Sequence, residues 1–206
     1  MKRKIIYLFI IITAIYFSAQ LIENNSKRIV QNSDSRSSHS AESDATPEIG
    51  GNFNLINQFN KQVSMSDFSG DYLLIYFGYT FCPDVCPLSV NEMLLTKKRL
   101  EKVNKKITPI FITIDPERDD LKNIKAFAEK FDNEIICLTG NKKEISETTK
   151  KFRIYVKRSE EIDDNEQYLI DHASIFYIFN KKGKFLKHFP HGSSAEELYQ
   201  YLNKKI

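Results

Sequence analysis

The sequence predicts an α/β domain with a mixed sheet flanked by helices, preceded by one N-terminal membrane helix. Apolar runs typical of buried strands alternate with segments of helical spacing, which predicts parallel strands joined by helices. The last two apolar runs are separated only by a short turn, which adds an antiparallel pair. Two cysteines, Cys82 and Cys86, lie between a strand and a helix and indicate where the chemistry takes place.

The N-terminus is typical of a membrane anchor. Basic residues at positions 2–4 precede an apolar run over residues 5–19, which is the layout of an export signal. Cleavage after Ala19 would leave the bulky Phe17 where a small residue is preferred, so an uncleaved anchor is favoured over a cleaved signal peptide. The basic residues predict that the N-terminus stays in the cytoplasm and that the rest of the chain lies outside. We assign residues 1–22 to this anchor.

A flexible linker and one domain follow the anchor. Residues 23–48 are rich in Ser, Asn and Asp and read as a linker, and residues 49–206 suffice for one domain with one core. The formal net charge is +3, and the lysines are scattered rather than arranged in a basic stripe, so no nucleic-acid partner is expected. The 3 cysteines allow at most one intramolecular disulfide, which excludes a disulfide-stapled scaffold.

The first half of the domain is expected to hold a hairpin, a buried strand and a helix. Residues 53–55 alternate like a strand, and residues 62–63 can pair with them. Residues 72–77 form the nearly continuous apolar run of a strand that is covered on both faces. Apolar residues then recur at helical spacing over residues 88–103, and Pro87 suits the first helical position, where its missing N–H costs nothing.

The second half alternates strands and helices and ends with a hairpin and a helix. In order, we expect a strand at 107–114, a helix capped by Asp119 or Asp120 and running to about Phe131, a strand at 135–138, a helix at about 142–152, a strand at 175–179, its hairpin partner at 185–189, and a last helix with a capping box from Ser193 or Ser194 to Glu196 or Glu197. This order resembles a thioredoxin-like sheet.

The cysteine pair limits the chemistry to thiol redox reactions or soft-metal binding. Cys86 lies near the start of a helix, where unpaired N–H groups and the helix dipole favour a thiolate. If both cysteines join the first turn, their spacing of four puts them on one face. Cys137 lies inside an apolar strand and is expected to be a buried core thiol.

A third metal ligand is expected from the histidines. His172 comes just before the strand at 175–179, and in a thioredoxin-like sheet the loop entering that strand lies against the start of the active-site helix. Redox enzymes of that fold usually place a cis-proline in this loop and have two residues between their cysteines, whereas this chain has His172 and three. Two thiolates and an imidazole suit copper, Cu(I) especially, although zinc accepts such ligands and prefers four.

The chain resembles the Sco/SenC family, copper proteins needed for assembly of cytochrome c oxidase. Three segments carry the resemblance: Phe77-Gly78-Tyr79-Thr80-Phe81-Cys82-Pro83-Asp84-Val85-Cys86-Pro87, Thr113-Ile114-Asp115-Pro116-Glu117-Arg118-Asp119 and Asp171-His172-Ala173-Ser174-Ile175-Phe176-Tyr177. The resemblance implies a thioredoxin-like domain that binds one copper ion, Cu(I) or Cu(II), through Cys82, Cys86 and His172. Asp115 and Asp171 are candidates to orient one of these metal ligands by a hydrogen bond, without binding the ion themselves.

The resemblance also implies a membrane-tethered copper metallochaperone that assists maturation of the binuclear copper centre of cytochrome c oxidase. Its partner would be the oxidase subunit that carries this centre, and another copper carrier or a thiol reductant is a further expected partner. The alternative is an enzyme, a thiol–disulfide oxidoreductase that reduces the cysteines of the oxidase copper site with Cys82 and Cys86 as its redox-active pair. A copper or redox sensor is a weaker reading.

The expected location is the bacterial inner membrane, crossed once, with the domain facing the periplasm. The N-terminus carries an anchor without a clear cleavage site and lacks an Arg-rich transit peptide. The mitochondrial inner membrane, with the domain facing the intermembrane space, is the alternative.

Overall fold

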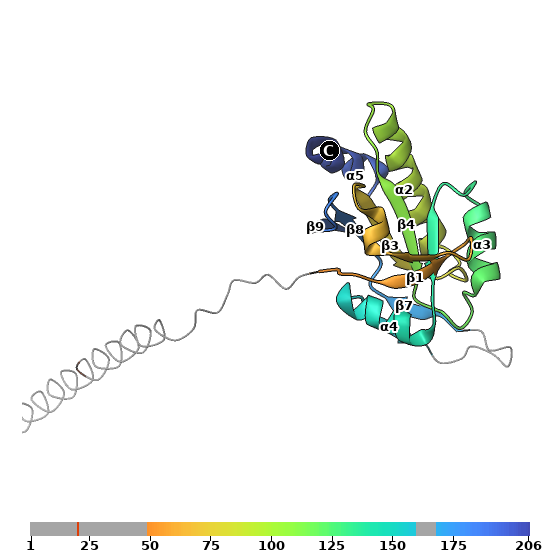
Figure 1. Ribbon diagram of the computed structural model, residues 1–206. Helices are drawn as coiled ribbons and strands as arrows, with labels where there is room; N and C mark the ends of the chain where they lie inside the picture. The colour runs from red at the N-terminus through yellow and green to blue at the C-terminus, as the bar shows by residue number, and fades with distance from the viewer. Residues whose placement is uncertain (1–19, 21–48, 160–167) are drawn as a thin grey trace, which may run out of the picture. The chain divides into compact units, whose positions relative to one another are not determined.

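The structure of the chain, a computed structural model, describes residues 20, 49–159 and 168–206 (Figure 1). By packing, the chain divides into two units, Met1–Thr46 and Pro47–Ile206. The predicted anchor at 1–22, except for Gln20, and the whole of the predicted linker at 23–48 lie outside the described residues. No helix in the described part of the chain is long and apolar enough to cross a membrane.

The second unit consists of strands and helices in alternation. In chain order they are β1 (Asn54–Asn57), β2 (Gln62–Ser64), the short 3-10 helix η1 (Met65–Phe68), β3 (Leu73–Gly78), α2 (Val85–Glu101), β4 (Thr108–Thr113), α3 (Leu121–Glu129), β5 (Ile136–Thr139), α4 (Lys142–Lys151), β6 (Val156–Arg158), β7 (Ile170–His172), β8 (Ile175–Phe179), β9 (Phe185–Pro190) and α5 (Ala195–Lys205).

The central sheet is mixed, as the sequence predicts. Its strand order is β2-β1-β5-β4-β3-β8-β9, and β3, β4 and β5 run parallel at its centre. β1 joins β5 antiparallel, and β8 joins β3 antiparallel with Tyr76 opposite Phe176. The α/β class with a mixed sheet flanked by helices is therefore confirmed.

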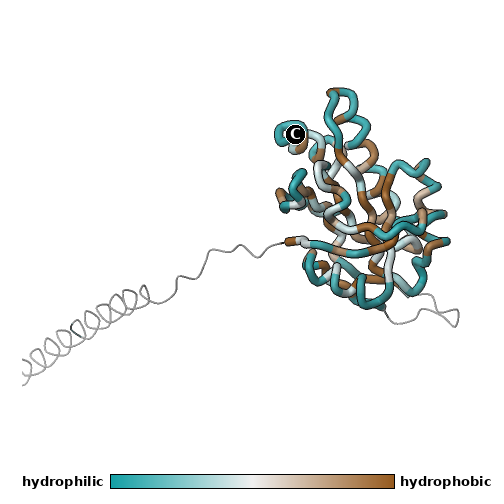
Figure 2. The backbone as a smooth tube through the Cα atoms, viewed as in Figure 1, coloured by the Kyte–Doolittle hydropathy of each residue, from teal (hydrophilic) through white to brown (hydrophobic). Residues whose placement is uncertain are grey.

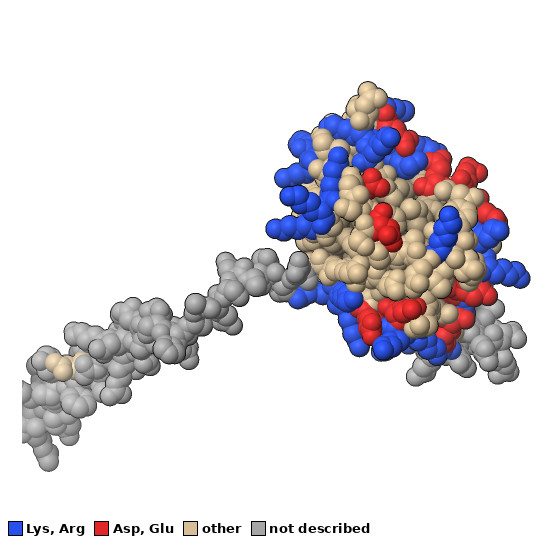
Figure 3. All heavy atoms as spheres, viewed as in Figure 1, with Lys and Arg blue, Asp and Glu red and all other residues tan. Residues whose placement is uncertain are grey.

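Strand β3 is the centre of the core, and all six of its residues are buried. On one face of the sheet Tyr76 packs against Phe176, with ring centroids 5.2 Å apart, and α2, α3 and α5 cover this face. On the other face Phe77 packs against Tyr177 and against Phe152 at the end of α4. Apolar residues are concentrated in the central strands (Figure 2), and charged residues of both signs lie interspersed on the visible surface (Figure 3).

The helix starts agree with the capping residues expected from the sequence. Asp120 caps α3 by accepting a hydrogen bond from the Asn123 backbone N–H at 2.8 Å. Ser194 and Glu197 form the capping box of α5.

The segment that precedes β8 differs from the prediction, because His172 belongs to a strand rather than to a loop. β7 pairs antiparallel with β6 in a separate two-stranded sheet, where His172 lies opposite Val156. β6 is exposed along its length and reads Val-Lys-Arg, so it lacks the apolar run by which the sequence identifies strands. Pairing between segments this distant in sequence leaves no local pattern.

The core around Phe152 should dominate stability. The Phe152 ring is fully buried and contacts Phe53, Phe77, Tyr177 and Phe179. Phe152→Ala should lower the free energy of unfolding by about 3–5 kcal/mol, because it removes a large apolar side chain and leaves a cavity. Urea denaturation followed by circular dichroism measures this change.

Phe59→Ala is the matched control. The Phe59 side chain is 57% exposed, so its loss should change the free energy of unfolding by less than about 0.5 kcal/mol. Equal destabilisation by both substitutions would contradict the assignment of the core.

Candidate metal centre

The two cysteines lie on either side of the start of α2. Cys86 is the second residue of the helix and is fully buried, whereas Cys82 is half-buried in the loop between β3 and α2. The helix begins at Val85, three residues before the predicted start at Leu88. Cys82 therefore precedes the first turn, and the expectation that both cysteines share one face of that turn is corrected.

The two sulfurs nevertheless form a pair. The pKa of Cys82 is lowered to about 5, chiefly because the Cys86 thiol donates a hydrogen bond to its sulfur. The N–H groups of Asp84 and Cys86 act in the same direction, while partial burial opposes them. The pKa of Cys86 is raised, first by its hydrogen bond to Cys82 and then by burial. In the reduced pair the outer sulfur is thus a thiolate and the inner one keeps its proton.

Gly78, at the end of β3, leaves the space that the inner sulfur occupies. A Cβ atom at this position would stand 2.7 Å from the Cys86 Sγ and 2.8 Å from the Phe111 ring. Side chains do not approach so closely, and therefore a residue without Cβ lets the first turn of α2 pack directly against the strand.

A buried carboxylate fixes the loop that carries Cys82. Asp119 is fully buried and accepts hydrogen bonds from the Thr80 N–H at 2.9 Å, from the Thr80 hydroxyl at 2.6 Å and from the Thr113 hydroxyl at 2.6 Å. Burial raises its pKa, and these donors oppose the rise. From the sequence, Asp119 is predicted only as an alternative cap for the following helix. Asp120 forms that cap instead, and Asp119 is free to bind the loop.

Asp115, a candidate to orient a metal ligand, contacts Arg118 and Tyr168 rather than His172. Its buried carboxylate pairs with the Arg118 Nε at 2.5 Å and accepts a hydrogen bond from the Tyr168 hydroxyl at 2.7 Å. The Arg118 guanidinium lies 3.5 Å from the centre of the Tyr168 ring and 5.1 Å from that of Phe81, the neighbour of Cys82. Asp115 therefore contacts Arg118, whose guanidinium in turn lies beside Phe81.

The ring of His172 is held at both nitrogens and by a tyrosine. Its Nδ1 lies 3.1 Å from the Ile170 carbonyl oxygen, and its Nε2 lies 3.2 Å from the Ser174 hydroxyl. Because a carbonyl only accepts, Nδ1 carries the proton and Nε2 presents its lone pair, an assignment made from the partners. The Tyr79 ring meets His172 edge to face, with centroids 5.9 Å apart.

An open pocket of about 370 Å³ joins the predicted ligands. Cys82 and His172 both line it, together with Tyr79, Ser174 and the exposed Asp171. Cys86 lies behind Cys82 and is sealed from solvent. Within the described residues, no three His, Cys, Asp or Glu side chains are grouped so as to hold a metal ion. The fold thus brings Cys82 and His172 to one pocket with Cys86 beside it, but the three side chains do not stand together as a metal-binding group.

The donor set fits a soft metal ion. Two sulfurs and an imidazole nitrogen with a free lone pair are ligands that Cu(I) favours. His172 would exchange its Ser174 hydrogen bond for the ion, while the Ile170 carbonyl keeps Nδ1 protonated and the ring oriented.

The chain is similar in sequence to a family model and to several known proteins. A family model described as SCO1/SenC matches residues 41–206. An SCO2-like protein of Rickettsia conorii is 40% identical over 158 residues, which cover 77% of this chain and 77% of that protein. Protein sco1 of Schizosaccharomyces pombe is 38% identical over 166 residues, which cover 77% of this chain and 63% of that protein.

Solved structures of related proteins share the fold. ScoI of Bradyrhizobium japonicum with copper bound is 34% identical, with a TM-score of 0.69, and the match covers 77% of this chain and 99% of that one. ScoI of Arabidopsis thaliana with copper bound is 29% identical, with a TM-score of 0.71, over 76% of this chain and 96% of that one. The thioredoxin-like fold expected from the sequence is confirmed, and the chain belongs to the SCO1/SenC family.

Proposed function

We propose that this chain is a copper metallochaperone that binds one copper ion, Cu(I) or Cu(II), through Cys82, Cys86 and His172. The observation that carries the proposal is the shared pocket of Cys82 and His172, with the Cys86 sulfur directly behind. Copper bound in the structures of two family members supports the identity of the ion.

The copper is cargo, and its recipient is the binuclear copper centre of cytochrome c oxidase. A carrier must hold the ion firmly and still release it, and the site supports both requirements. The inner sulfur is protected by burial, while Cys82 and His172 face the pocket from which a partner's ligands approach. The copper-centre subunit of the oxidase is the proposed recipient, and another copper carrier or a thiol reductant would prepare the site beforehand.

The N-terminal residues 1–22 would tether the domain to a membrane through the linker at 23–48. The basic residues followed by an apolar run support a single-pass anchor in the bacterial inner membrane, with the domain in the periplasm. Relatives named as mitochondrial, from Arabidopsis thaliana and Homo sapiens, favour the mitochondrial inner membrane as the alternative location.

Copper titration of the reduced full chain tests the ligand set. The wild type should take up one Cu(I) per chain, measured by competition with a chromophoric chelator under anaerobic conditions. His172→Ala should weaken binding by more than the roughly 10–100-fold that loss of an outer partner of a ligand costs, because a ligand itself is lost. Cys82→Ala and Cys86→Ala should each remove tight binding.

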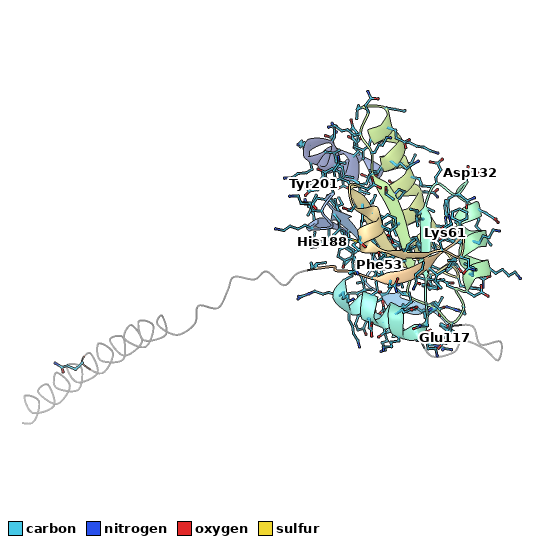
Figure 4. The ribbon with its side chains drawn as sticks, viewed as in Figure 1. Phe53, Lys61, Glu117, Asp132, His188 and Tyr201 are labelled. Carbon is cyan, nitrogen blue, oxygen red and sulfur yellow. The ribbon has the colours of Figure 1, made fainter. Side chains whose placement is uncertain are left out.

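His188→Ala is the matched control for the histidine. His188 lies on β9 between Tyr177 and Phe185 and does not line the pocket that Cys82 and His172 share. Figure 4 shows it apart from Glu117, in the loop after β4. Its loss should leave copper binding unchanged. Tight one-to-one copper binding by His172→Ala would rule out His172 as a ligand.

A second function, thiol–disulfide exchange, is favoured by the unequal cysteines. The Cys82 thiolate would attack a disulfide of the partner and form a mixed disulfide, releasing one partner thiolate. The Cys86 sulfur would then lose its proton, displace the second partner sulfur and close a Cys82–Cys86 disulfide. The partner gains two electrons, and the pair is oxidised.

Turnover without metal separates the two functions. If exchange is the main function, the metal-free reduced chain should reduce a disulfide-linked model peptide of the oxidase copper site, and His172→Ala should leave the rate unchanged, because exchange needs only the sulfurs. The reaction is followed by mass spectrometry of the peptide. An inert metal-free chain whose copper-loaded form transfers its ion to the peptide would count against the oxidoreductase function.

The reactivity of Cys82 should be nearly independent of pH near neutrality. A pKa of about 5 leaves this thiol fully ionised above pH ~6.5, so its alkylation rate should stay flat up to pH ~8.5. Cys86→Ala removes the main donor and should restore the steep rise of an ordinary thiol with a pKa of about 8.5. Iodoacetamide labelling with peptide mapping measures both rates, and a steep rise in the wild type would contradict the assignment of the thiolate.

A further inference from the structure

One polar group beside the cysteine pair has no function in the site as described so far. Tyr76, on β3, is fully buried, and its hydroxyl makes a hydrogen bond of normal geometry with none of the described residues. An unpartnered buried hydroxyl is unfavourable, and a phenylalanine would fill the same space without that cost. The hydroxyl therefore calls for a partner that arises in another state of the site.

The hydroxyl lies next to the inner sulfur. The Tyr76 ring and the Cys86 sulfur share the space above Gly78, where a Cβ would stand 2.7 Å from Cys86 Sγ and 3.2 Å from Tyr76 Cε1. Ser89 and Ser174 are the other polar neighbours of the hydroxyl. The Ser174 hydroxyl already contacts His172 Nε2.

Metal binding would make the inner sulfur a suitable partner. A thiol sulfur is a weak hydrogen-bond acceptor. A sulfur that binds a metal ion is a thiolate, whose proton has left to solvent, and a charged acceptor makes a much stronger hydrogen bond.

We propose that Tyr76 is a positioning residue for the inner ligand, and that its hydroxyl donates a hydrogen bond to the Cys86 sulfur when that sulfur binds the metal. This inference rests on the proposed copper function. The bond holds the inner sulfur in place while the outer sulfur and His172 face the incoming partner. Tyr76 contacts a ligand and not the ion.

The test compares Tyr76→Phe with Tyr177→Phe in the full chain. Tyr177 is also a buried tyrosine but lies on the opposite face of the sheet, against Phe77. Tyr76→Phe should weaken Cu(I) binding by about ten- to a hundredfold, the range for a hydrogen bond to a charged group. The midpoint of urea unfolding and the dithiol–disulfide equilibrium in a glutathione buffer should not change, because neither involves a metal-bound sulfur at Cys86. Tyr177→Phe should leave all three quantities unchanged.

Each result has a definite meaning. Weaker copper binding with unchanged unfolding and redox equilibria supports the assignment. Unchanged copper affinity in Tyr76→Phe overturns it, and so does a parallel loss of affinity and stability, which would indicate packing. If wild-type protein fails to bind one copper ion, the proposed function fails and this inference with it, whereas wild-type binding with an unaffected Tyr76→Phe variant sinks the inference alone.

Discussion

The geometry of the site depends on one buried carboxylate. Asp119 ties the loop after β3 to the end of β4 through the two hydroxyls and one N–H that donate to it. The neighbouring strands end side by side, since Gly78 lies opposite Thr113 in the parallel pair. A charge with no solvent contact is tolerated only when its oxygens are satisfied, so these donors and the carboxylate require each other. The loop that carries Cys82 has a fixed starting point for this reason.

The same segment of chain also braces the histidine side of the site. Arg118, next to Asp119, donates to the Tyr168 carbonyl at 2.9 Å and lies against the Tyr168 ring, two residues before β7. Tyr79, next to Thr80, packs its ring edge to face with His172. Asp119 and Arg118 therefore support the segments that carry both Cys82 and His172, the proposed ligands, although neither of them lines the pocket between them.

Features with a local cause could be predicted from the sequence, and features set by distant contacts could not. The apolar run of β3, the cap at Asp120 and the capping box at Ser194 each follow from neighbouring residues. The strand that holds His172 forms by pairing with the polar β6, and the function of Asp119 follows from hydroxyls 6 and 39 residues away in sequence. The start of α2 was predicted too late in the chain. Pro87 suggested the first helical position, whereas the helix begins at Val85.

The unequal environments of the two sulfurs connect the two proposed functions. A half-buried thiolate beside a fully buried thiol is an arrangement that disulfide exchange can use, and it also gives a metal ion one ligand that a partner can reach and one that it cannot. The sulfurs alone therefore do not distinguish electron transfer from metal transfer. His172 does, because exchange requires only the two sulfurs, whereas a metal ion needs a third donor. The contacts that fix this ring at Ile170, Ser174 and Tyr79 hold a lone pair at the pocket, which is the stronger physical argument for copper.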